Sequence, residues 1–292
     1  MFLVLVLGIT AIGCEDTDPE AGFDEHKQDG PVELKIVQGE NGPAFPDAQF
    51  EIETPAADEI VSADSVNVTT KVAGVELKAP TAGEGANGLA YSADGQHIHV
   101  IIDGNPYMAK YDATFSIGKL EPGPHTLRAF PSRSWHESVK TPGVFVARTF
   151  YVGEKSGEPV LKADQPLLTY SRPKGKYVGK DARKIMLDFY IANCELGADG
   201  YKVIASVDGK VLDTLTTWVP YYIEGLKEGE HTIGLKLIGP DGNLVENGPF
   251  NDVQQTITVV EKEESSDEEA ASTEVPEEEK EMHDVMRHSQ GL

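Results

Sequence analysis

Two stretches of the chain, residues 93–104 and residues 198–209, share one pattern and decide the fold class. The first reads Ala-Asp-Gly-Gln-His-Ile-His-Val-Ile-Ile-Asp-Gly, and the second reads Ala-Asp-Gly-Tyr-Lys-Val-Ile-Ala-Ser-Val-Asp-Gly. Each begins with a turn, continues as an apolar strand and ends with an Asp-Gly turn. A second shared element, Leu-x-x-Gly-x-His-Thr followed by Leu or Ile, starts at Leu120 and again at Leu226. The chain therefore repeats a unit of about 105 residues, the size of one immunoglobulin-like domain.

Short strands separated by turn signals make up both copies, and a helical period of apolar residues is nearly absent. Such strands bury their apolar faces by packing as two sheets. We therefore expect an all-β protein with two tandem immunoglobulin-like β-sandwich domains, at 45–153 and 154–261. The expected strands are 49–53, 65–72, 97–102, 114–117, 125–130 and 144–152 in the first copy, and 167–170, 184–192, 202–207, 216–223, 231–238 and 254–260 in the second.

The segments outside the two copies indicate export and anchoring. Residues 2–13 form an uncharged, mostly apolar run that is too short to span a bilayer and is typical of a signal peptide. Cys14 follows Ala11-Ile12-Gly13, which resembles the lipobox of bacterial lipoproteins and implies a lipid on Cys14 that binds the membrane. We expect a signal peptide at 1–14, a flexible acidic tether at 15–44 and a disordered acidic tail at 262–292.

Charge and cysteine content exclude several classes of function. The chain carries 49 acidic residues against 25 Lys and Arg, a net charge of −24, so it has no basic surplus for nucleic acid. Cys194 has no partner if Cys14 is acylated, and we expect it to be a small buried residue. The motifs of serine hydrolases, phosphate-binding loops, zinc proteases and calcium loops are missing, which predicts a protein that is not an enzyme.

His97 and His99 alternate on one expected strand, so both side chains leave the same face of its sheet. Ile98, Val100 and Ile102 form a core stripe on the other face, and the second copy lacks the histidine pair. Two histidines bind copper or zinc when a third ligand arrives, and the nearest candidates in the sequence are His136 and Glu137. The alternative is a pair of histidines held by hydrogen bonds on a sheet face. His125 and His231, which recur in both copies, are expected to have a structural role.

The segment Pro131-Ser-Arg-Ser-Trp-His-Glu-Ser138 gathers cationic, aromatic and acidic groups where the second copy has a plain turn. Loops at sandwich ends often carry binding residues, and Arg and Trp dominate binding hot spots. We take Arg133, Trp135, His136, Glu137 and Tyr107 as candidate ligand-binding residues. The alternative is a loop in which the tryptophan covers the sandwich end and the charges are solvated.

His97-Ile-His99-Val-Ile-Ile-Asp103-Gly104-x-Pro106-Tyr107, with the loop Ser132 to Ser138, resembles a family of secreted bacterial proteins labelled "phosphopeptide-binding protein". The resemblance covers residues 46–152. It implies phosphopeptide binding, although the Gly-Arg pair of forkhead-associated phosphopeptide readers occurs nowhere in the chain.

Three functions remain open. The first is a non-catalytic binding or adhesion lipoprotein at the outer membrane or cell surface of a Gram-negative bacterium, with a protein, peptide or glycan ligand recognised by the first domain. The second is a copper- or zinc-binding protein that uses His97 and His99, and the third is a phosphopeptide-binding protein.

Overall fold

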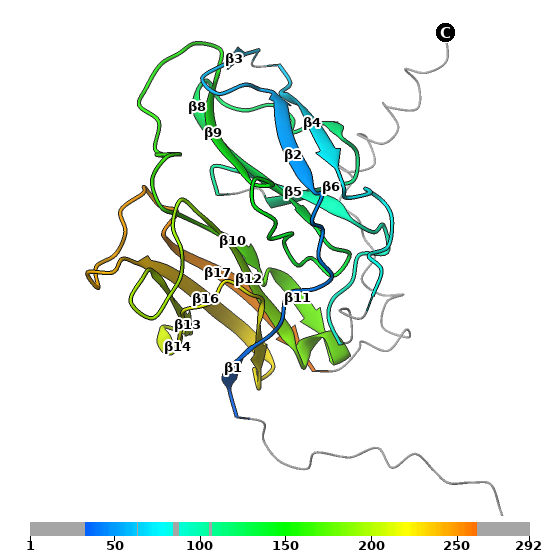
Figure 1. The fold of residues 1–292 in the computed structure, drawn as a ribbon, viewed down its shortest axis with the longest axis vertical. Helices are drawn as coiled ribbons and strands as arrows, with labels where there is room; N and C mark the ends of the chain where they lie inside the picture. Colours follow the sequence, from blue (N-terminus) through cyan, green and yellow to red (C-terminus); the bar gives the residue numbers. More distant parts are fainter. Residues whose placement is uncertain (1–32, 63, 84–87, 105–106, 262–292) are drawn as a thin grey trace, which may run out of the picture. The chain divides into compact units, whose positions relative to one another are not determined.

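The first sandwich consists of two mainly antiparallel sheets (Figure 1). One apolar core lies between them. The computed structural model describes residues 33–62, 64–83, 88–104 and 107–261. Three strands form one sheet in the order β2 (Gln49–Thr54), β4 (Asn67–Ala73), β7 (Thr114–Ser116). Five strands form the other in the order β3 (Ile60–Val61), β9 (Val146–Val152), β8 (Gly123–Ser132), β5 (His97–Ile102), β6 (Tyr107–Lys110).

The second sandwich repeats this plan. Its smaller sheet has the order β1 (Lys35–Gln38), β15 (Tyr221–Glu224), β12 (Ile185–Ala192), β10 (Leu167–Arg172). Its larger sheet has the order β11 (Gly175–Val178), β17 (Asp252–Val260), β16 (Gly229–Ile238), β13 (Lys202–Val207), β14 (Lys210–Leu215). Helix is confined, among the described residues, to one short 3₁₀ turn, η1 (Gly179–Ala182). The predicted tandem all-β fold is confirmed.

Equivalent strands pair in the same way in both copies. β3 lies parallel to β9, and β11 lies parallel to β17, whereas the neighbouring ladders β8–β9 and β16–β17 are antiparallel. The β5–β8 register places His97 opposite Ser132, and the β13–β16 register places Lys202 opposite Ile238. Positions in the two copies can therefore be compared residue by residue.

A shared Asp–His pair explains the two repeated histidines. Asp103 and Asp208 both adopt a positive φ, at 53° and 50°, in the turns that follow β5 and β13. The Asp208 carboxylate accepts the Thr232 N–H at 2.9 Å and lies 2.8 Å from His231 Nδ1. His125 makes the matching 2.6 Å contact with Asp103 in the first copy. These bonds fasten a turn to the next strand, so the expected structural role of both histidines is confirmed.

The segment at 15–44 is not entirely a tether. Residues Lys35–Gln38 form β1, which pairs antiparallel with β15 at the edge of the second sandwich. Leu34 and Ile36 pack against the core of that sandwich. Their apolar side chains alternate with Lys35, which is the pattern of a strand with one buried face. The strand was not predicted because the acidic composition of residues 15–44 as a whole is typical of a flexible tether.

The other terminal predictions lie outside the described residues: the signal peptide, the lipid on Cys14, the remainder of the tether up to residue 32 and the tail at 262–292. Within the described part of the chain, no helix has the length and apolar character needed to cross a membrane. Cys194 is a free, partly buried thiol, and burial raises its pKa to about 11.

The two sandwiches contact each other directly. Ile101 and Phe130 of the first pack against Tyr190 of the second. Asp188 on β12 forms a buried ion pair with Lys140 at 2.5 Å and accepts the Ser138 N–H at 3.0 Å. The outer face of the larger sheet of the first sandwich is therefore covered, and the side chains that leave β5 on that face are buried.

Candidate metal centre

β5 places two histidines on a buried, non-core face. Ile98, Val100 and Ile102 point into the first sandwich core, as predicted. His97 and His99 leave the opposite face of the same strand and are fully buried. A strand has a side-chain period of two, so this placement follows from the sequence alone. Their burial does not, because it depends on contact with the second sandwich.

The third histidine comes from the turn that follows β8. The Arg133 N–H donates to the Glu137 carbonyl and the His136 N–H donates to the Arg133 carbonyl, both at 2.9 Å. This is a three-residue hairpin loop, which ends on a residue in the left-handed region, normally a glycine. His136 occupies that position with φ +67°.

The second copy has the same turn with the expected glycine. The Gly239 N–H donates to the Asn243 carbonyl at 2.8 Å, and the Gly242 N–H donates to the Gly239 carbonyl at 2.9 Å. Gly242 has φ +82° and is the equivalent of His136. The left-handed backbone conformation at this position favours glycine in both copies. The first copy nevertheless has a histidine there, in spite of the steric cost.

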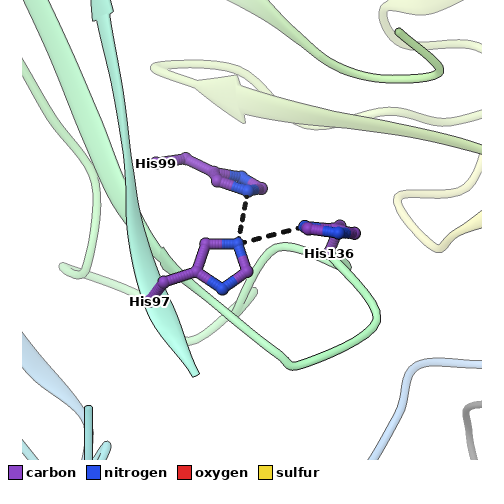
Figure 2. Close-up of side chains that lie close together, drawn as sticks. All are labelled: His97, His99 and His136. Atoms are coloured by element: carbon purple, nitrogen blue, oxygen red, sulfur yellow. Dashed lines mark hydrogen bonds between the residues drawn. The ribbon is translucent and has the colours of Figure 1, made fainter. Parts of the chain in front are cut away.

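Figure 2 shows that the three imidazoles converge. His97 Nε2 lies 2.8 Å from His99 Nε2 and 3.1 Å from His136 Nδ1. The potential ligand atoms of all three lie within 4.8 Å of one another. Nitrogen ligands of zinc lie about 2.0–2.1 Å from the ion, so one ion is within reach of all three after small adjustments of the rings.

Two neighbouring groups orient the imidazoles. His97 Nδ1 lies 2.9 Å from the Gly95 carbonyl and must donate to it, which leaves a lone pair on Nε2. His99 Nδ1 is hydrogen-bonded to the Tyr107 hydroxyl, which also lies 3.1 Å from Ser171 Oγ in the second sandwich. Metal-binding histidines in proteins are oriented in the same way, by a carbonyl or another polar group on the second ring nitrogen.

All three histidines are neutral at neutral pH. Burial lowers the pKa of His97 to about 4 and that of His136 to about 2, and it holds the pKa of His99 well below its usual range. The nearby Arg172 and Lys174 lower these pKa values further. Neutral imidazole is the form that binds a metal.

Protons alone satisfy this cluster poorly. Neutral His97 offers one lone pair at Nε2, yet His99 Nε2 and His136 Nδ1 both lie within hydrogen-bonding distance of it. One of the two can donate to that lone pair, and the other then meets a site that is already occupied. A metal ion removes the conflict, because each nitrogen directs a lone pair to the ion.

The remaining loop candidates have a different role. Arg133, Trp135 and Glu137 are all buried. Arg133 pairs with Glu137 at 3.2 Å and donates to the carbonyls of Gly42, Pro43 and Ser138, and Trp135 Nε1 donates to Glu137 at 2.8 Å. The charges that we expected to be solvated or to face a ligand are therefore buried against residues 42–43.

The structure adds residues that sequence reasoning missed. Ser171, Arg172 and Lys174 reach the cluster or Tyr107 from the second sandwich. Gly95 contributes its carbonyl. No local pattern in the sequence marks the three residues of the second sandwich, because they approach through contact between the two sandwiches. Tyr107, which the sequence singled out only as part of the motif with a family resemblance, lies beside His99 with ring centroids 4.8 Å apart.

No family model matches the chain, and no curated protein matches it. Among solved structures, the chain is similar to the fibronectin(III)-like modules of Clostridium thermocellum CbhA, with 16% identity over 73% of this chain and 95% of that chain and a TM-score of 0.26. It is also similar to the mixed-linkage glucan utilisation protein SGBP-B of Bacteroides ovatus, with 14% identity over 72% of this chain and 47% of that chain and a TM-score of 0.21.

Proposed function

We propose that this chain is a non-catalytic binding protein of the cell envelope whose first sandwich holds a copper or zinc ion through His97, His99 and His136. The observation that carries the proposal is the convergence of three neutral imidazoles on one point, with a single lone pair for two neighbouring nitrogens. A glycine position occupied by His136 supports it independently.

The ligand set favours these two metals. Imidazole nitrogen suits zinc and copper, whereas magnesium, calcium and manganese prefer oxygen ligands. Three protein ligands leave one position open, as in zinc sites that accept a further ligand. Arg172 and Lys174 oppose the binding of a cation, so an anion in the open position would offset their charge.

Isothermal titration calorimetry with Zn²⁺ and with Cu²⁺ tests the site on the full chain after EDTA treatment. We expect one ion per chain, because the three imidazole nitrogens lie close enough to share a single ion. We expect a Kd of about 1 μM or tighter, which corresponds to a binding free energy of about −8 kcal/mol. His99→Ala removes one ligand and should weaken binding at least tenfold, the lower end of what outer-shell changes alone produce at metal sites. Circular dichroism establishes that the variant is folded.

His231→Ala is the matched control. It removes a histidine of the second copy that is bonded to Asp208 and lies outside the three-histidine cluster. Its affinity for both metals should equal that of the wild type. Binding of neither metal, or equal loss of affinity in His231→Ala and His99→Ala, contradicts the proposal.

The envelope location rests on the resemblance of Ala11-Ile12-Gly13-Cys14 to a lipobox. Incorporation of labelled palmitate that is lost in Cys14→Ser tests it. Any protein, peptide or glycan partner would be recognised by the first sandwich. A phosphopeptide would require an exposed cation in the loop at 132–138, and the buried, bonded Arg133 does not support that alternative.

A further inference from the structure

A cavity of about 410 Å³ lies where the two sandwiches meet, beside the three-histidine cluster. Its size is in the range of small-molecule sites in proteins. Tyr107 and Arg128 line it from the first sandwich, and Tyr170, Ser171, Lys174 and Phe250 line it from the second. Three aromatic rings and two cations therefore face one space.

Arg128 is a buried cation, and the charge of Asp103 acts on it only from beyond ion-pair distance. Its side chain lies on β8, and the residue is 4% exposed. One terminal nitrogen donates to Thr169 Oγ1 over a long 3.3 Å, and its Nε has no hydrogen-bond partner. Among the residues that the structure describes, none forms an ion pair with it. A buried, unpaired guanidinium is unfavourable unless something else neutralises it.

The ring of Phe250 fixes the plane of this guanidinium. Arg128 Cζ lies 4.5 Å from the centroid of that ring, so the guanidinium packs on the aromatic face. Stacking holds the planar donor set in place while Nε stays unpaired. Burial lowers the pKa of Arg128 to about 10, which leaves it charged at neutral pH.

Lys174 adds a second cation to the same wall. Its Nζ lies 4.0 Å from the centroid of the Tyr107 ring and donates to the Tyr107 carbonyl at 2.9 Å. Asp103 is the acidic residue at the cavity, and its carboxylate is bonded to His125 and to the Thr126 N–H. Among the described residues, neither Arg128 nor Lys174 forms an ion pair, although the charge of Asp103 acts on Arg128 and opposes the lowering of its pKa by burial.

We propose that this cavity binds a small organic anion, with an oxyanion head on Arg128 and Lys174 and a flat or apolar body against Tyr107, Tyr170 and Phe250. A guanidinium presents paired N–H donors that match a carboxylate or a phosphate. This inference goes beyond the metal site, because no metal ion enters it.

Thermal unfolding and calorimetry with benzoate, phenyl phosphate and benzamide test it on the EDTA-treated full chain. We expect a saturable rise in Tm with benzoate or phenyl phosphate, and the stronger of the two identifies a carboxylate or a phosphate head. Benzamide has a similar shape and no charge, so it should leave Tm unchanged. Because EDTA removes metals, this outcome is independent of the three-histidine site.

Arg128→Met keeps the length of the side chain and removes its charge. Its Kd for the preferred anion should rise about 10- to 100-fold, the equivalent of one charge-assisted hydrogen-bonded contact. Without ligand, its Tm should be no lower than that of the wild type, because a buried unpaired charge is gone. A purely structural Arg128 would instead lower the Tm on substitution.

Arg148→Met is the control for loss of a half-buried arginine that donates to backbone carbonyls. Arg148 donates to the carbonyls of Ile52 and Pro55 and does not line the cavity, so this variant should bind the anion as the wild type does. Lys174→Gln, on a half-buried side chain, should weaken binding about 3- to 10-fold and replaces Arg128→Met if that variant does not fold. Equal responses to benzamide and the anions, no response to either anion, or unchanged affinity in the cavity variants would overturn the proposal.

Discussion

His136 is the residue at which the two copies of the fold differ most informatively. It has a left-handed backbone conformation where the second copy has Gly242. A side chain in that conformation costs about 1–2 kcal/mol. His136→Gly should therefore raise the free energy of unfolding in EDTA by about 1 kcal/mol and weaken metal binding at least tenfold. Urea unfolding and metal titration measure the two effects.

Gly242→His in the second copy is the reciprocal control. It places a histidine in the same turn without His97 or His99 nearby, so it should lower the free energy of unfolding by about 1 kcal/mol and add no metal site. A loss of stability in metal-free His136→Gly would instead mean that packing of the His136 ring stabilises the loop.

The Asp208–His231 pair gives a pH dependence at the residue scale. Burial lowers the pKa of His231, but the Asp208 and Lys227 hydrogen bonds and the Asp208 charge outweigh it and raise that pKa above 6.5. Burial raises the pKa of Asp208, but the His231 and Thr232 bonds bring it below 3.8. The contribution of His231 to the free energy of unfolding is complete below pH 6.5 and is lost as the pH rises through the pKa of the folded state. The aspartate contribution is complete above pH 3.8 and is lost as the pH falls.

The pair should therefore stabilise the fold most between pH 3.8 and pH 6.5. We expect His231→Gln to lose about 0.5 kcal/mol at pH 5 and less at pH 8.5, since the pair is partly exposed and screened. Urea titrations of wild type and variant at both pH values measure this. An equal loss at the two pH values would mean that the bonds to the neutral ring carry the effect.

The sequence was sufficient to identify the three histidines as a cluster, but not to predict that the charged residues of the loop at 132–138 are buried. The alternation of His97 and His99 fixes their shared face, and the comparison with a plain turn in the second copy marked His136. Burial of Arg133 and Glu137 could not be predicted, because Gly42 and Pro43 cover them from about 90 positions earlier in the chain.

At the scale of elements, β1 closes an edge that would otherwise be open. It pairs with β15 through all four of its residues, Lys35 to Gln38. Ile36→Asp places a charge against the second core, so it should lower the free energy of unfolding by about 1–3 kcal/mol. Hydrogen exchange should accelerate at the amides of Tyr221–Glu224, and Gln38→Asp, which places the same charge at an exposed position of the strand, is the control. Unchanged exchange would show that β1 does not protect this edge.

The strands predicted well are those with a buried, β-branched face. The expected strand at 97–102 coincides with β5, and the one at 202–207 coincides with β13. The strands missed were β1, β3, β6, β11 and β14, which are edge strands in their sheets. Edge strands have weak apolar patterns, because part of their surface faces solvent and pairing alone holds them.

At the scale of the whole molecule, the Lys140–Asp188 ion pair joins the two sandwiches. Both side chains are buried, and Asp188 also accepts the Ser138 N–H. Asp188→Ala leaves Lys140 charged and unpaired, so it should cost about 3–5 kcal/mol. We expect two calorimetric unfolding transitions in place of one shared transition, and Lys140→Met combined with Asp188→Leu should recover part of the loss. A single, equally stable transition in Asp188→Ala would show that the pair does not couple the sandwiches.

Contact between the sandwiches could not be predicted from the repeat. A repeat indicates two units of the same design and says nothing of which faces meet. The residues that enclose the histidines, among them Ser171 and Lys174, belong to the second unit. The tandem all-β fold was therefore accessible from the sequence, whereas the surroundings of the site were not.

The strand β1 also has a mechanical consequence. The chain passes through the edge of the second sandwich before it enters the first, so tension applied upstream of Lys35 loads the β1–β15 ladder first. The first sandwich, with its three histidines, is reached only after that ladder has come apart. Under force on the N-terminal segment, the β1–β15 ladder would separate first, and the three imidazoles would keep their positions.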